Sequence, residues 1–180
     1  MTRLTEGLAG WRKLRTARRA ELIQALNAHA GLMIATAIRV LGSLHDAEDI
    51  AQDIAEKLLR SPPPSVHNWP AYLKTLSVNR AIDRLRQRRP TVGTDDITHS
   101  STPESELEAS ERADALRDAV ATLKHRDATL FSLYYLADLN QAEIGRQLDM
   151  TESAVGVALH RIRQRLSSTL RTQLQLGEKE

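Results

Sequence analysis

Hydrophobic residues recur along this chain in steps of three and four, which is the spacing of amphipathic helices. The first clear run lies within residues 18–41 and ends at Gly42, a residue type that commonly terminates helices. A second run within 46–60 stops before the three prolines of 62–64, through which no helix continues. Because no segment alternates with the period of two that strands show, the pattern predicts an all-α fold.

A third helix is predicted over residues 69–89, with Asn68 as its N-cap and Pro70 in its first turn. The segment 91–108 that follows is rich in Ser, Thr and Asp near its start and acidic near its end. Such a composition is typical of a linker between domains.

The second half of the chain shows further helical patterns. One is predicted to end near Lys124 and another to start at Asp127, while Asn140 and Glu143 resemble a capping box that opens a short helix. Thr151 is predicted to cap the last helix. The predicted division is a tail or frayed helix over 1–17, a helical domain over 18–90, an acidic linker over 91–108, a second helical domain over 109–174 and a tail over 175–180.

The distribution of charge along the chain is more informative than the net charge. The net charge is only +2, but residues 80–89 carry five arginines against one acid, and 156–172 carry four arginines and no acid. Between them, residues 91–115 carry seven acids against one arginine. Two basic stretches separated by an acidic one indicate two binding sites for a polyanion.

Several classes of protein are disfavoured by composition. There is no cysteine, and the six histidines are scattered without metal-ligand spacing. No phosphate-binding glycine loop or nucleophile elbow is present, so we expect no catalytic site, no metal and no cofactor. Neither a signal peptide nor an apolar run of about 20 residues is found, which predicts a cytoplasmic protein without membrane insertion.

The segment 140–163 is the first candidate for a binding function. A short helix, a turn over 149–151 and a longer helix match the spacing of a helix-turn-helix that binds DNA. Gly145 lies where the two helices would approach closely, and a small residue is needed there. The alternative is an ordinary helical hairpin with a solvated basic face.

The predicted helix over 69–89 is the second candidate. Trp69 and Tyr72 could stack on unpaired bases while the neighbouring arginines meet phosphates, as in proteins that hold single strands. The alternative is that both aromatic side chains simply cover the core. Asp83 could serve as an internal partner for a neighbouring arginine.

The third candidate is acidic. Asp46, Asp49 and Asp53 share one helix face opposite the apolar positions. A solvated surface is the ordinary explanation, but an acidic ridge repels DNA, so this face is more suited to another protein.

These residues together resemble a known family. The stretches Asp46–Asp53, Asn68–Leu73 and Asn79–Arg86 resemble region 2 of the extracytoplasmic-function sigma factors, and Gln141–Gly145 with Leu159–Arg163 resembles their region 4. The resemblance implies an alternative sigma factor that binds core RNA polymerase and directs promoter recognition, DNA melting and transcription initiation.

The resemblance also implies three sets of binding residues. The acidic helix would bind polymerase through Asp46, Glu48, Asp49, Ile50, Gln52 and Asp53. The third helix would melt and read the −10 element through Trp69, Tyr72, Asn79, Arg80, Arg84, Arg86 and Arg88. The last helix would read the −35 element through Thr151, Glu152, Ser153, Gly156, His160, Arg161 and Arg163.

The partners implied are the clamp of the polymerase's largest subunit, the flap of the second-largest subunit, promoter DNA and an anti-sigma protein. The family often has a basic residue where this chain has Gly156 and Ala158, which favours readout through backbone and shape. Two other functions fit the pattern: a stand-alone dimeric helix-turn-helix regulator, and a protein-interaction adaptor whose basic stretches are merely solvated.

Overall fold

The computed structural model describes the backbone of residues 2–88 and 104–177, and the side chains of 17–88 and 109–171. The described residues form seven helices and no strand: α1 (Thr2–Leu41), α2 (Leu44–Arg60), α3 (Trp69–Gln87), α4 (Glu104–Thr122), α5 (His125–Tyr135), α6 (Gln141–Leu148) and α7 (Glu152–Gly177). The prediction of an all-α fold is therefore confirmed. The predicted linker residues 91–103 lie outside the described residues.

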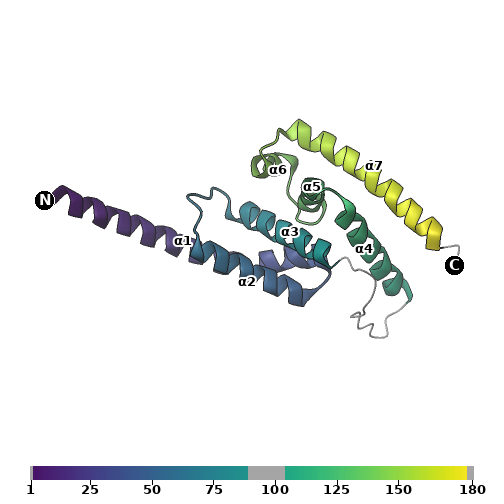
Figure 1. Cartoon of the computed structure of the whole chain (residues 1–180), viewed down its shortest axis with the longest axis horizontal. Coiled ribbons are helices and arrows are strands. Elements are labelled where there is room, and N and C mark those ends of the chain that lie inside the picture. Colours follow the sequence, from purple (N-terminus) through teal and green to yellow (C-terminus); the bar gives the residue numbers. More distant parts are fainter. Residues whose placement is uncertain (1, 89–103, 178–180) are drawn as a thin grey trace.

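In the first half of the chain, α1 packs against both α2 and α3 (Figure 1). The turn between α1 and α2 is built from local signals that the sequence carries. Gly42 has a φ of +73°, which glycine adopts without strain, and the Ser43 hydroxyl accepts a hydrogen bond from the Asp46 amide at 3.3 Å. The aliphatic side chains facing inward, among them Met33 and Ile54, are almost fully buried.

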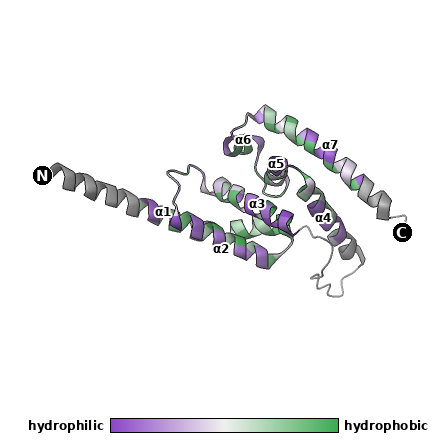
Figure 2. Cartoon of the chain, in the orientation of Figure 1, coloured by the Kyte–Doolittle hydropathy of each residue, from purple (hydrophilic) through white to green (hydrophobic). Residues whose placement is uncertain are grey.

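In the second half, α7 packs on α4, α5 and α6. The predicted capping box is confirmed, because the Asn140 carboxamide accepts from the Glu143 amide at 2.9 Å while the Glu143 carboxylate accepts from the Asn140 amide at 3.0 Å. Thr151 caps α7 as predicted, accepting from the Ala154 amide at 3.2 Å. Hydrophobic and hydrophilic residues both recur in the coloured parts of these helices, as expected of amphipathic helices that pack on one side (Figure 2).

Residues 2–17 form the start of α1, so of the two alternatives predicted for this segment, a tail or a frayed helix, the structure has a helix. No proline interrupts the segment, and each glycine costs a helix only about 1 kcal/mol. Two other helix starts differ from the predictions. α5 begins at His125, because Asp127 stands in the first turn, where the helix dipole favours an acid, and not at the cap. α4 begins at Glu104, inside the segment predicted to be a linker.

The two halves are in contact, and α3 lies between them (Figure 1). One side of α3 packs on α1 and α2, while the other meets α4, α5 and α6. Where the two halves meet, the Arg117 side chain of α4 lies against Gly42. A Cβ on Gly42 would come within 2.7 Å of the guanidinium. The sequence predicted two domains but not that they pack together.

Candidate nucleic-acid interface

The helix-turn-helix is closed by a tight turn. Asp149 ends α6 in the left-handed conformation with a φ of +53°, and the Met150 amide donates to the Gly145 carbonyl at 2.9 Å. A Cβ on Gly145 would lie 2.5 Å from the Met150 carbonyl oxygen. The predicted need for a small residue at this position is confirmed, although its close neighbour is the backbone of the turn and not the second helix.

Apolar side chains fix the angle between α6 and α7. Ile144 and Val155 are fully buried, Leu159 is nearly so, and Leu148 is half-buried against the core. These four apolar residues lock the two helices together. With the inner face of α7 occupied by packing, its polar residues are directed outward.

The outer face of α7 carries the residues predicted to read the −35 element. Six of the seven are exposed: Thr151, Glu152, Ser153, His160, Arg161 and Arg163. The exception is Gly156, which is half-buried because the Gln141 side chain of α6 lies over it, 3.1 Å from where a Cβ would be. Val157 was missed by sequence reasoning. It stands on this outer face with 57% of its surface exposed.

On α3, the inner residues agree with the helical pattern, since Val78, Ala81 and Ile82 are fully buried. Trp69 and Tyr72 are half-buried against this core, with ring centroids 6.0 Å apart in an edge-on arrangement. The Trp69 indole donates to the Glu21 carboxylate at 3.1 Å, and burial raises the pKa of the Tyr72 phenol. The two aromatic residues therefore cover part of the core, while the rest of each side chain is exposed.

The arginines of α3 fall into two groups. Arg80 and Arg86 are exposed, whereas Arg84 and Arg88 form ion pairs with Asp46 at the start of α2. The Arg84 guanidinium lies 3.1 Å from the Asp46 carboxylate, whose side chain is only 10% exposed. The prediction that Asp46 belongs to an exposed acidic ridge is wrong, because this carboxylate neutralises two arginines from a neighbouring helix.

The rest of α2 presents a polar face. Glu48, Gln52 and Asp53 are exposed, Asp49 is half-buried, and Gln52 donates to the Glu56 carboxylate at 3.2 Å. We refer to the exposed residues Glu48, Gln52, Asp53 and Glu56, with Asp49 beside them, as the α2 ridge. Ile50 of the predicted polymerase-binding set lies in the core and contributes only by packing.

The side of α3 that faces the second half carries polar residues of its own. The Thr129 hydroxyl donates to the Asn79 carboxamide oxygen at 2.8 Å, and the His125 imidazole lies 3.0 Å from the Asp83 carboxylate. The Lys74 ammonium donates to the Ala137 carbonyl at 2.6 Å. The prediction that Asp83 pairs with a neighbouring arginine is wrong, since its partner is a histidine of α5.

Two family models match this chain. A family model of sigma-70 region 2 matches residues 25–91, and one of sigma-70 region 4 matches residues 113–166. The chain is 31% identical over 140 residues to the ECF RNA polymerase sigma factor SigF of Caulobacter vibrioides, covering 74% of this chain and 75% of that protein. It is 28% identical over 149 residues to the ECF RNA polymerase sigma factor SigW of Bacillus subtilis, covering 74% and 80%.

The chain belongs to the extracytoplasmic-function sigma factors. It is thus an alternative sigma factor, which binds core RNA polymerase and promoter DNA and directs transcription initiation, and it is not an enzyme. The helix α2 and the helix α3 fall within the region 2 match, and the helix-turn-helix of α6 and α7 falls within the region 4 match.

The sigma factor has no described helix that is both long enough and apolar enough to cross a membrane.

Proposed function

We propose that the sigma factor divides its binding between three surfaces, with a polymerase site on α2, a −10 site on α3 and a −35 site on α7. The region 2 domain would extend over residues 18–90, and the region 4 domain from the start of α4 at Glu104 to residue 174, joined by the segment between them. The observation that carries this proposal is the separation of charge. Acids gather on the α2 ridge, whereas exposed arginines stand on α3 and α7.

The α2 ridge suits a protein partner better than DNA. Asp53 and Glu48 stand exposed on a helix whose opposite side is fixed in the core by Ile50 and Ile54. A rigid row of acids repels phosphates and attracts a basic surface. We propose that Glu48, Asp49, Gln52 and Asp53 bind the clamp of the polymerase's largest subunit, with Ile50 supporting them from within. Asp46 is left out of this set because its charge is already neutralised.

For the −10 element, the proposed contacts are made by Arg80 and Arg86 with the exposed edges of Trp69 and Tyr72, and by Asn79. Aromatic edges beside cations are suited to an unpaired strand. Arg84 and Arg88 would contribute to the same positive field while remaining paired with Asp46.

For the −35 element, the proposed readers are the exposed residues of α7. Thr151, Glu152 and Ser153 stand at its N-terminal end, where the recognition helix of a helix-turn-helix contacts base edges. Further along, His160, Arg161 and Arg163 would meet phosphates. Gly156 lies under Gln141 and would act by allowing close approach instead of by a side-chain contact.

Two further partners are proposed from family membership alone. The region 4 domain would contact the flap of the second-largest polymerase subunit, and an anti-sigma protein would restrain the sigma factor. Because the partner is the transcribing polymerase, the compartment that we propose is the cytoplasm.

The polymerase site is tested by charge reversal. Asp53→Arg and Asp49→Arg are expected to abolish saturable binding of the labelled protein to core polymerase, measured by fluorescence anisotropy. Asp118→Arg reverses an exposed acid of α4 outside the ridge and is the matched control, which should bind as the wild type does. Equal binding by all three variants would exclude the α2 ridge as the polymerase site. Tight, specific duplex binding without polymerase would favour a stand-alone regulator instead.

A further inference from the structure

Val157 is an unusual residue for the outer face of α7. Its neighbours one turn away on that face are Ser153 and Arg161, both exposed and polar, yet 57% of the Val157 surface meets solvent. The core of the helix-turn-helix does not need this side chain, because Val155, Ala158 and Leu159 already fill the inner face. A β-branched residue also gains nothing as a helix former in an exposed position.

In the major groove, the one apolar feature of a base edge is the C5-methyl group of thymine. We infer that Val157 contacts a thymine methyl and so determines specificity at one base pair of the −35 element. Ser153 and Arg161 on either side would supply hydrogen bonds and phosphate contacts but cannot detect a methyl group. This inference rests on the proposed function of α7.

The test compares Val157→Ala with the wild type in two steps. Holoenzymes reconstituted with each protein select DNA from a library randomised over the −35 element. The wild type is expected to enrich thymine at one position, and Val157→Ala to lose that preference. Replacing this thymine by deoxyuridine, which lacks only the methyl group, should then weaken binding by the wild type about four-fold, the value of one buried methyl group, and leave Val157→Ala unaffected.

The matched control is Ile23→Ala, which truncates another exposed β-branched residue, 43% exposed on α1. It should keep the thymine preference. If Val157→Ala selects the same sequences as the wild type, or deoxyuridine makes no difference to the wild type, the inference is wrong. If the wild-type holoenzyme selects no sequence at all, the proposed function itself fails.

Discussion

The helices α3 and α7 both carry exposed arginines, but their polar faces meet different surroundings. On α7 the outer face, from Ser153 to Arg163, is exposed apart from Gly156. On α3 the polar side is divided, with Arg80 and Arg86 exposed while Asn79 and Asp83 are taken up by α5. A polar helix face is therefore not always a free surface, because a second domain can satisfy it with hydrogen bonds.

The difference follows from the chemistry of the two contacts. The inner face of α7 is held by aliphatic side chains, whose burial is favourable in any state of the protein. The covered side of α3 combines hydrogen bonds with apolar side chains, because one hydrophobic core runs through both halves. Of these contacts, water can replace the polar ones at little cost.

The largest effect is expected on the α7 side, from Gly145→Ala. The new Cβ would lie 2.5 Å from the Met150 carbonyl oxygen, which is backbone and cannot move without opening the turn. We expect this crowding to cost about 2–3 kcal/mol of unfolding free energy, measured by urea denaturation. Gly31→Ala is the matched control, since among the described atoms none lies within 4 Å of its Cβ position.

Gly31→Ala should leave stability unchanged or raise it by up to about 1 kcal/mol, because alanine is the better helix former. Equal effects of the two substitutions would show that the turn after α6 tolerates a side chain, and that the predicted close approach is not a constraint.

A smaller loss is expected on the α3 side, from Asp46→Ala. This carboxylate is the common partner of Arg84 and Arg88, and it fixes the end of α3 to the start of α2. Because both arginines remain partly exposed and can be hydrated, we expect a loss of about 2 kcal/mol, less than for a fully buried pair. Asp53→Ala removes an exposed acid of the same helix and should change stability by less than about 0.5 kcal/mol.

Thermal or urea unfolding distinguishes the two substitutions. A loss from Asp53→Ala as large as that from Asp46→Ala would mean that the general charge of α2, and not the buried carboxylate, sets stability.

Much of this architecture could be predicted because it depends on local signals. The caps Asn68 and Thr151, the capping box at Asn140 and the small residue at Gly145 each act within a few residues of sequence. The inward positions of each helix follow from the 3.6-residue period. The family resemblance rests on the order of several such motifs, and it was confirmed by the family models and the similar sigma factors.

What could not be predicted depends on partners distant in sequence. Asp46 and Asp53 look alike along α2, and only the arrival of Arg84 and Arg88 from α3 distinguishes the buried acid from the exposed one. In the same way, no residue near Asn79 in the sequence indicates its hydrogen bond with Thr129, which is 50 residues away. Hydropathy predicts neither contact, because a paired polar residue and a solvated one give the same hydropathy pattern.

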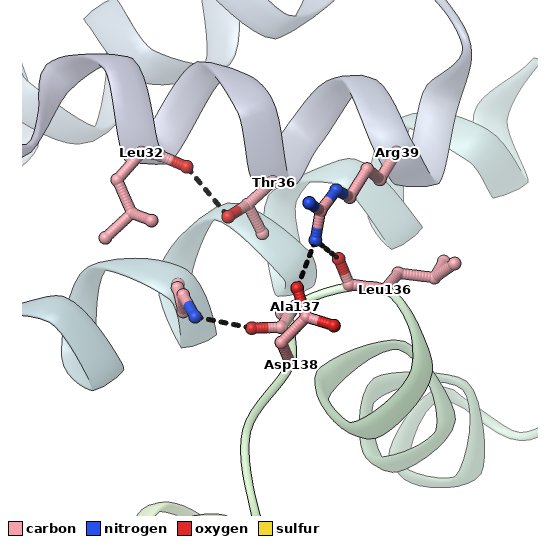
Figure 3. A network of polar contacts seen from close by, with 7 residues as sticks. Leu32, Thr36, Arg39, Leu136, Ala137 and Asp138 are labelled. Atoms are coloured by element: carbon pink, nitrogen blue, oxygen red, sulfur yellow. Dashed lines mark hydrogen bonds and ion pairs between the residues drawn. The ribbon is translucent and has the colours of Figure 1, made fainter.

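The smallest effect sharpens the comparison most directly, because it concerns only the contact between the halves. Arg39 of α1 and Asp138 form an ion pair between the halves (Figure 3). Asp138→Arg places like charges together and should weaken this contact, while Arg39→Asp with Asp138→Arg restores an opposite pair in reversed order. Both side chains are more than half exposed. We therefore expect a coupling free energy of about 0.5 kcal/mol in a double-mutant cycle of unfolding free energies, and added salt should reduce it. The reversed pair cannot regain the hydrogen bond from Arg39 to the Leu136 carbonyl, so rescue should be partial. Complete independence of the two substitutions at low salt would mean that the ion pair contributes nothing, and that the Lys74 and Asn79 contacts and the shared apolar core hold the halves together.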